Sequence, residues 1–150
     1  MSAEENRDLV RIPYEAFNDR DFDRVLPVIA PDARITSPVI GGTFAGPAGF
    51  QQYLQTWADA FPDARIEITK IIADQEGAAV EFTGRGTNAG PLVTPAGEIS
   101  PTGRHGEQRF CDVYRIRNGK IVGLHVYFDL TTLLTYVDVA GLLREFRLST

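Results

Sequence analysis

Apolar residues recur at three- and four-residue spacings along the first sixty positions, which is the pattern of amphipathic helices. Residues 4–18 carry this pattern with an aromatic end at Tyr14 and Phe17, and Pro13 predicts a kink within the helix. A second, shorter helix is expected over residues 21–30. A third is expected to begin at Gly46-Pro47 and to run to about residue 60, with Tyr53 and Trp57 on a wide aromatic face.

The spacing of apolar residues changes to two after residue 64, which is typical of half-buried strands. Strands are predicted over residues 65–73, 78–85, 107–117 and 120–129. Asn118-Gly119 joins the last two and is a strong signal for a tight hairpin. Residues 86–101 are rich in glycine, proline and threonine and are expected to form a loop, and one or two helical segments should close the chain.

Helices followed by an antiparallel meander indicate an α+β fold in which the helices pack on one face of a curved sheet. We expect a single domain over residues 1–150, with a pocket between helices and sheet that suits a small hydrophobic ligand.

Charge and composition exclude several classes of partner. The net charge is -5, with no basic run, so neither nucleic acid nor a membrane surface is an expected partner. The polar, acidic N-terminal residues do not resemble a secretory signal, and we expect a cytoplasmic protein. The single cysteine, Cys111, is expected to be a buried small apolar residue.

Motifs for phosphate binding, zinc binding and serine nucleophiles are absent from the sequence, so no metal and no cofactor is predicted. The candidate chemistry is concentrated on the last two predicted strands. Strand alternation places His125, Tyr127 and Asp129 on one face. Asp112 and Tyr114 share a face of the preceding strand, and the register of the hairpin decides whether the two clusters meet.

Asp129 is the leading candidate for a general acid/base, because a carboxylate facing an apolar cavity gains proton affinity through desolvation. The alternative is that Asp129 caps a helix that begins at residue 130 or 131. His125 could be catalytic, or simply a packed or surface residue. Tyr127 and Tyr114 could donate to an oxyanion or merely pack.

Four further aromatic residues are candidates for substrate contacts in the pocket wall or for the core: Tyr14, Phe17, Tyr53 and Trp57.

Several segments resemble the SnoaL-like polyketide cyclases. They are residues 14–22 and 46–50 in the helical half, Pro101-Thr102-Gly103-Arg104, the run from Asp112 to Val122, and Asp129 with Leu133-Leu134 behind it. The resemblance covers nearly the whole chain. It implies the cone of the nuclear transport factor 2-like type, a homodimer formed through the sheet, and a role in aromatic polyketide antibiotic biosynthesis.

The resemblance also implies that Asp129 is the acid/base of a cofactor-free intramolecular aldol ring closure on a polyketide-like substrate. Relatives commonly have Glu-His-Trp where this chain has Gly123-Leu124-His125, so its histidine is displaced by one residue. Two alternatives remain open. One is hydroxylation or epoxide opening, which Asp112 near Asp129 would favour, and the other is a non-catalytic module that binds a small ligand or dimerises.

Overall fold

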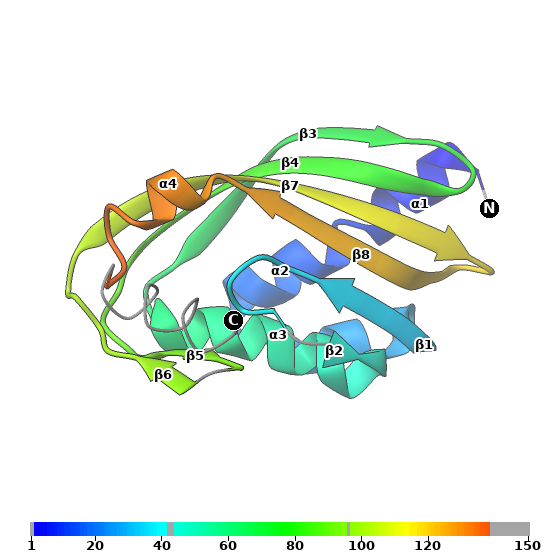
Figure 1. Ribbon diagram of the computed structural model, residues 1–150. Helices are drawn as coiled ribbons and strands as arrows, with labels where there is room; N and C mark the ends of the chain where they lie inside the picture. Colours follow the sequence, from blue (N-terminus) through cyan, green and yellow to red (C-terminus); the bar gives the residue numbers. More distant parts are fainter. Residues whose placement is uncertain (1, 42–43, 96, 139–150) are drawn as a thin grey trace.

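A computed structural model describes residues 2–41, 44–95 and 97–138 of the chain (Figure 1). The elements in chain order are α1 (Ala3–Leu9), α2 (Ile12–Asp19), the 3-10 helix η1 (Phe22–Val28), β1 (Ile29–Thr36), β2 (Phe44–Ala45), α3 (Gly46–Ala60), β3 (Arg65–Ala73), β4 (Gly77–Thr87), β5 (Leu92–Thr94), β6 (Gly97–Ile99), β7 (His105–Arg117), β8 (Lys120–Phe128) and α4 (Leu130–Leu133).

Six strands form one curved sheet in the order β2-β1-β8-β7-β4-β3. Neighbouring strands are antiparallel except β1 and β8, which run parallel. The helices α1, α2 and α3 lie on one side of this sheet, and α4 lies at the end of β8 (Figure 1). The chain therefore has the predicted α+β architecture, with one parallel pair added to the expected antiparallel meander.

The prediction of one kinked helix over residues 4–18 is wrong in detail, because the chain forms two helices there. Ser2 caps α1, where its side chain accepts from the backbone of Glu5 and the Glu5 side chain accepts in return. The second helix begins at Ile12, with Pro13 in its first turn, where a proline needs no backbone donor. Pro13 thus starts a helix instead of bending one.

The helix expected over residues 21–30 is a 3-10 helix that ends at Val28, and β1 begins directly after it. Pro31 and Asp32, expected to stop a helix, lie within that strand. The helix predicted from Gly46 to about residue 60 is confirmed by α3. The predicted loop over residues 86–101 contains a small hairpin, β5 with β6.

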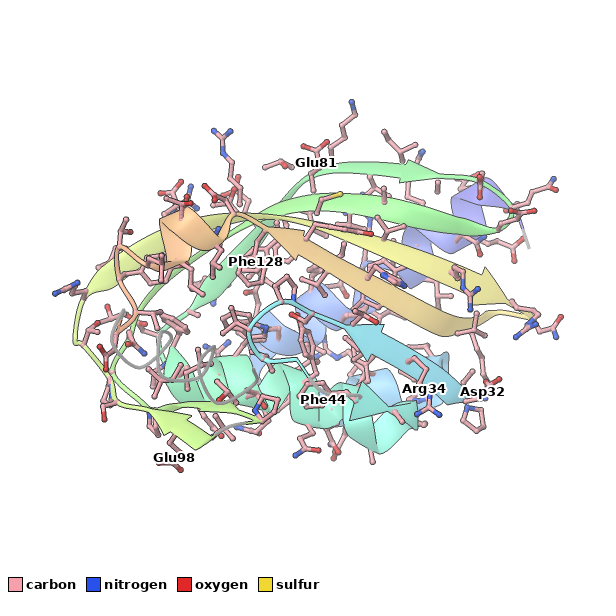
Figure 2. The ribbon with its side chains drawn as sticks, viewed as in Figure 1. Asp32, Arg34, Phe44, Glu81, Glu98 and Phe128 are labelled. Atoms are coloured by element: carbon pink, nitrogen blue, oxygen red, sulfur yellow. The ribbon has the colours of Figure 1, made fainter. Side chains whose placement is uncertain are left out.

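Alternation along the strands divides the sheet into an inner face toward the helices and an outer face away from them. Phe128 points inward and Glu81 points outward (Figure 2). The turn at Asn118-Gly119 has both residues at positive φ, 53° and 75°, as a two-residue hairpin requires. Away from this turn the β7–β8 register shifts: Ile116 pairs with Ile121 but Arg115 pairs with Gly123, so β8 holds one extra residue, Val122.

The side chain of Asn18, at the end of α2, pairs with the backbone of the edge strand β3. Asn18 donates from its amide nitrogen to the Ile66 carbonyl at 2.8 Å and accepts from the Ile66 N–H at 2.8 Å. Arg20 adds donated bonds to the carbonyls of Pro62 and Ala64, at 3.0 and 2.8 Å. Asn18 therefore pairs with the exposed edge as a neighbouring strand would.

Two clusters of buried apolar residues hold the layers together. The larger lies between α1, α2, α3 and the inner face of the sheet. The smaller joins the end of α3 and the β5–β6 hairpin to Leu133, Tyr136 and Val137. Residues 139–150, where part of the expected closing helical segments would fall, lie outside the described residues. Over the part of the chain described here, no helix is both long and apolar enough to cross a membrane.

We expect Asn18→Ala to lower the free energy of unfolding by about 1–3 kcal/mol, because the part-buried backbone groups of Ile66 lose both partners. Urea denaturation measures this loss. Asn18→Asp is the matched control: it keeps an acceptor for the Ile66 N–H but loses the donor, and should have an intermediate stability. Equal stability of Asn18→Ala and the wild type would show that water replaces the amide at this edge.

Candidate functional site

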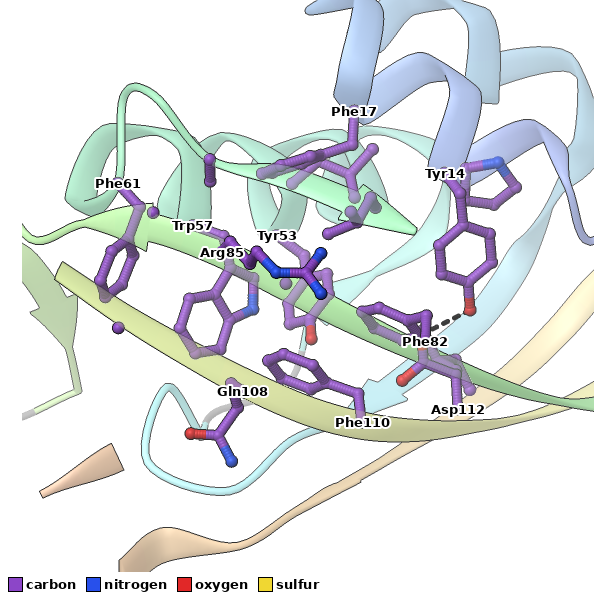
Figure 3. A pocket seen from close by; sticks show the side chains of 18 of the residues that line it. Tyr14, Phe17, Tyr53, Trp57, Phe61, Phe82, Arg85, Gln108, Phe110 and Asp112 are labelled. Atoms are coloured by element: carbon purple, nitrogen blue, oxygen red, sulfur yellow. Dashed lines mark hydrogen bonds between the residues drawn. The ribbon is translucent and has the colours of Figure 1, made fainter. Parts of the chain in front are cut away.

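A pocket lies between the helices α2 and α3 and the inner face of β4 and β7 (Figure 3). Apolar and aromatic side chains make up most of its lining. Its polar lining residues include two hydrogen-bonded groups, Asp112 with Tyr14 and Tyr114, and Gln108 with Tyr136, besides Tyr53 and Arg85. An apolar cavity with a few convergent polar groups is the usual form of a small-molecule site.

Asp112 lies on β7, directly opposite Val126 of β8, and its side chain is 5% exposed. The Tyr14 hydroxyl donates to Oδ2 of Asp112 at 2.7 Å. The Tyr114 hydroxyl donates in turn to the Tyr14 hydroxyl oxygen at 2.9 Å. Because Tyr114 supplies the proton of that second bond, the Tyr14 proton is directed at the carboxyl group.

The other carboxyl oxygen of Asp112, Oδ1, is buried and has no hydrogen-bond partner among the described residues. Burial disfavours the charged form and raises the pKa of Asp112 to about 7, although the hydroxyls of Tyr14 and Tyr114 act in the opposite direction. A carboxyl group of this kind exchanges its proton near neutral pH and has one oxygen free to do so.

Burial and the nearby charge of Asp112 also raise the pKa of three tyrosines, Tyr14, Tyr114 and Tyr53. These phenols therefore stay protonated at neutral pH. The side chains of Trp57 and Ser37 lower the pKa of Tyr53 and so partly offset this rise. Tyr53 is thus a neutral donor close to the carboxyl group.

Aromatic rings form the floor and one wall of the pocket. Phe82 and Phe110 stack on neighbouring strands with their ring centroids 4.7 Å apart and their planes 3° from parallel. Trp57 of α3 meets Phe110 edge-on at 5.9 Å. Tyr14 meets Phe82 in the same way at 4.9 Å. Such surfaces suit a flat, apolar ligand.

Gln108 and Tyr136 form the second polar group. The Tyr136 hydroxyl donates to Oε1 of Gln108 at 2.5 Å, and Nε2 of Gln108 donates to the Asp129 carbonyl at 3.1 Å. Thr102 holds the Tyr136 carbonyl at 2.7 Å. These bonds fix the segment after β8 against one end of the pocket.

Asp129 does not face the pocket, contrary to the expectation for a general base. It is exposed and caps α4: Oδ1 accepts from the Thr131 N–H at 2.9 Å, and Oδ2 accepts from the Thr132 hydroxyl at 2.8 Å. These bonds lower the pKa of Asp129. A stabilised, solvated carboxylate is a weak base, so the alternative of a helix cap describes this residue.

His125 and Tyr127 lie on the outer face of the sheet, away from the pocket. Both are exposed, and their rings stack at 6.4 Å. Alternation along β8 is as expected, but its polar face is the outer one, since Val126 is the residue paired with Asp112. Their predicted catalytic roles therefore have no geometric support.

The six residues expected in substrate contacts do line one pocket: Asp112, Tyr114, Tyr53, Trp57, Tyr14 and Phe17. Gln108, Phe110 and Phe82 also line the pocket and were not predicted from the sequence. The alternation that places Asp112 and Tyr114 on one face of β7 also places Gln108 and Phe110 there, and Phe82 is paired with Phe110 on β4.

The expected burial of Cys111 is only partial, since it lies half-buried on the outer face. No cluster of three or more His, Cys, Asp or Glu side chains suited to a metal ion occurs in residues 2–41, 44–95 and 97–138. The absence of a metal and a cofactor stays a prediction from the sequence.

Comparison with solved structures identifies the fold. A protein from Jannaschia sp. CCS1 inferred to be a SnoaL-like polyketide cyclase superposes with a TM-score of 0.79 at 14% identity, over 91% of this chain and 94% of that one. A nuclear transport factor 2-like protein of unknown function from Burkholderia pseudomallei K96243 gives 0.73 at 27% identity, over 90% and 98%. The inferred polyketide cyclase IdmH from Streptomyces antibioticus gives 0.69 at 28% identity, over 87% and 96%.

The sequence has no significant match among curated proteins. The sequence profile of the SnoaL-like domain matches residues 10–124. This stretch includes α2, α3, β3, β4 and β7, and therefore Asp112 and the two tyrosines bonded to it in series, Tyr14 and Tyr114. This chain belongs to the SnoaL-like family and has its nuclear transport factor 2-like fold.

Proposed function

We propose that this protein is a cofactor-free cyclase that closes a ring in a polyketide-like substrate by intramolecular aldol addition, with Asp112 as the acid/base. The observation that supports this proposal is a buried carboxyl group whose pKa is about 7 and whose Oδ1 has no partner in the described part of the chain, on the wall of an apolar pocket. The likeness to IdmH, an inferred polyketide cyclase, supports the class of substrate.

In the proposed reaction, Oδ1 of ionised Asp112 removes a proton from a carbon that lies between two carbonyl groups. The electron pair of that C–H bond forms an enolate, whose carbon attacks a ketone of the same molecule to form the new C–C bond. The ketone oxygen gains the negative charge and takes up the proton from Asp112. Substrate and product are isomers, so the step consumes no oxidant, reductant or water.

The tyrosines around Asp112 suit the charges that develop in this reaction. Tyr14 donates to Oδ2 and stabilises the ionised base, while Tyr114 keeps the Tyr14 proton in that direction. Tyr53 is a neutral phenol near Asp112, and its hydroxyl is the proposed donor to an enolate or alkoxide oxygen. Protonated donors in a dry pocket stabilise an oxyanion strongly.

The two alternative functions have less support. Hydroxylation or epoxide opening was linked to Asp112 lying near Asp129, but Asp112 is buried in the pocket whereas Asp129 is exposed at the α4 cap. A purely binding role was linked to a pocket without a carboxylate, and this pocket contains Asp112. Ring closure by a single carboxyl group fits the geometry better than either.

We further propose that the outer face of the sheet pairs with a second copy of the chain. Ile72, Val113 and Tyr127 are exposed there, with 57%, 39% and 56% of their surface accessible. Ile72, Ala79 and Val113 follow one another across three strands in register, so the apolar surface is continuous there, and His125 borders it on β8. A continuous exposed apolar patch is typical of an interface.

We expect Asp112→Asn to lower kcat by about 10²–10⁴-fold, because the amide keeps the shape of the carboxyl group but cannot take a proton. Anthraquinone-type β-keto esters serve as substrates, and mass-neutral ring closure is followed by chromatography. Asp129→Asn is the matched control and should keep wild-type activity, since asparagine also caps helices. Loss of activity in Asp129→Asn alone, with its fold intact, would contradict the assignment to Asp112.

The raised pKa of Asp112 also makes stability depend on pH. Between about pH 4 and pH 7 the folded protein keeps this proton while the unfolded chain has lost it, so stability should fall as pH rises. The slope is up to about 1.4 kcal/mol per pH unit for one group. Urea unfolding of wild type and Asp112→Asn at several pH values isolates this contribution: the variant should gain stability relative to wild type up to pH 7. Parallel curves would mean that Asp112 ionises normally.

Val113→Asp should convert the proposed dimer to a monomer, because it places a charge at the centre of the outer apolar surface. Light scattering after size exclusion is expected to give about twice the chain mass of 16.5 kDa for wild type. Val93→Asp, at a more exposed valine on β5, is the control and should stay dimeric. A monomeric wild type would refute the pairing.

A further inference from the structure

One position on the inner face of the sheet is empty where its neighbours carry side chains. Ile66 of β3, Gly84 of β4 and Gln108 of β7 lie side by side in register and all line the pocket. Gly84 therefore leaves a gap between the side chains of Ile66 and Gln108. The adjoining row, Phe82 and Phe110, is filled by stacked rings.

The fold does not require a glycine at position 84. A Cβ atom built there would lie 3.5 Å from both Ile66 Cγ2 and Phe110 Cε2, which is ordinary van der Waals contact, and the backbone φ is not positive. The next inward-facing glycines differ. A Cβ at Gly86 would approach Ala64 to 3.0 Å, and one at Gly106 would overlap the Tyr136 ring. Those two glycines serve packing, whereas Gly84 borders open pocket.

A second observation, an unpartnered polar atom in the pocket wall, favours a ligand with a polar end. Oδ1 of Asp112 is buried and has no hydrogen-bond partner among the described residues, and only 5% of the surface of Asp112 is exposed. Gln108, beside Gly84, lies four residues before Asp112 on the same face of β7. At the rise of a β-strand the two positions are about 13 Å apart. Phe110 and its stacked partner Phe82 lie at the position between them.

We propose that Gly84 is a specificity-determining residue: its missing side chain makes room for the far end of a flat, apolar ligand whose polar end binds Asp112. A ligand of three fused rings with one hydroxyl or enol group covers that span. A ligand of one ring bound to Asp112 is too short to cover the span of about 13 Å. The inference rests on the proposed function only in taking this pocket as the place where the substrate binds.

The test compares binding of phenol, 2-naphthol and 2-hydroxyanthracene, whose hydroxyl groups imitate an enol. Trp57 is the single tryptophan of the chain and lines the pocket, so quenching of its fluorescence reports occupancy. Gly84→Leu should weaken binding of 2-hydroxyanthracene by about tenfold or more and change phenol binding by less than about twofold. Gly84→Ala should also weaken binding of 2-hydroxyanthracene more than binding of phenol, but by a smaller factor.

Gly123→Ala is the matched control, because Gly123 lies in β8 outside the pocket and a Cβ there meets only the flexible end of Arg115. It should leave all three affinities unchanged. The melting temperature of Gly84→Leu should not fall below that of wild type, since a side chain in a strand interior adds contacts.

Equal losses for phenol and 2-hydroxyanthracene in Gly84→Leu, or no loss for 2-hydroxyanthracene, would overturn the proposal. Asp112→Asn provides a separate arm in the same assay. If it leaves the binding of phenol and 2-hydroxyanthracene unchanged, Asp112 does not hold the polar end of the ligand, and that part of the proposal is overturned. The acid/base role of Asp112 is tested separately by the kcat of Asp112→Asn, and discrimination by ring number at Gly84 is judged from wild type against the Gly84 variants.

Discussion

The hydrogen bond from Tyr14 to Asp112 joins two residues that are 98 positions apart, and it connects the helical layer to the sheet at the centre of the pocket. Without it, the carboxyl group would be buried beside aromatic rings with no stabilised charged form, and its pKa would rise further. With it, desolvation and hydrogen bonding balance at a pKa of about 7. The same bond fixes how closely α2 approaches the sheet, so the width of the pocket and the proton affinity of its carboxyl group have one origin.

The residue Val122 shows why the site could be predicted only in part. A hairpin closed at Asn118-Gly119 without irregularity would place Asp112 opposite His125, and all the polar groups of both strands would then share one face. The extra residue in β8 shifts the register by one, so Asp112 lies opposite Val126 and its polar neighbours on β8 turn outward. Alternation within each strand was predictable from the sequence, but a bulge depends on packing across strands and left no signal there.

Other successes and failures follow the same division between local and non-local causes. The helix α3 and the Asn118-Gly119 hairpin were predicted correctly because periodicity and turn chemistry are local. The pairing of β1 with β8 was not foreseen, since it depends on distant segments. Asp129 illustrates an ambiguity of residue type: an aspartate before a short helix suits a cap and a catalytic base equally, and only its exposure decides between them.

The parallel pairing of β1 with β8 has a consequence for the order of assembly. Thr36 pairs with His125, and Tyr14 reaches Tyr114 across 100 positions, so the contacts that complete the pocket span most of the chain. Contacts of such long range form slowly because the entropy of closing large loops must be overcome first. During synthesis, the β3–β4 hairpin is complete long before β8 leaves the ribosome. Until then Asp112 is an ordinary solvated carboxylate, and its capacity to hold a proton at neutral pH arrives with the last strand.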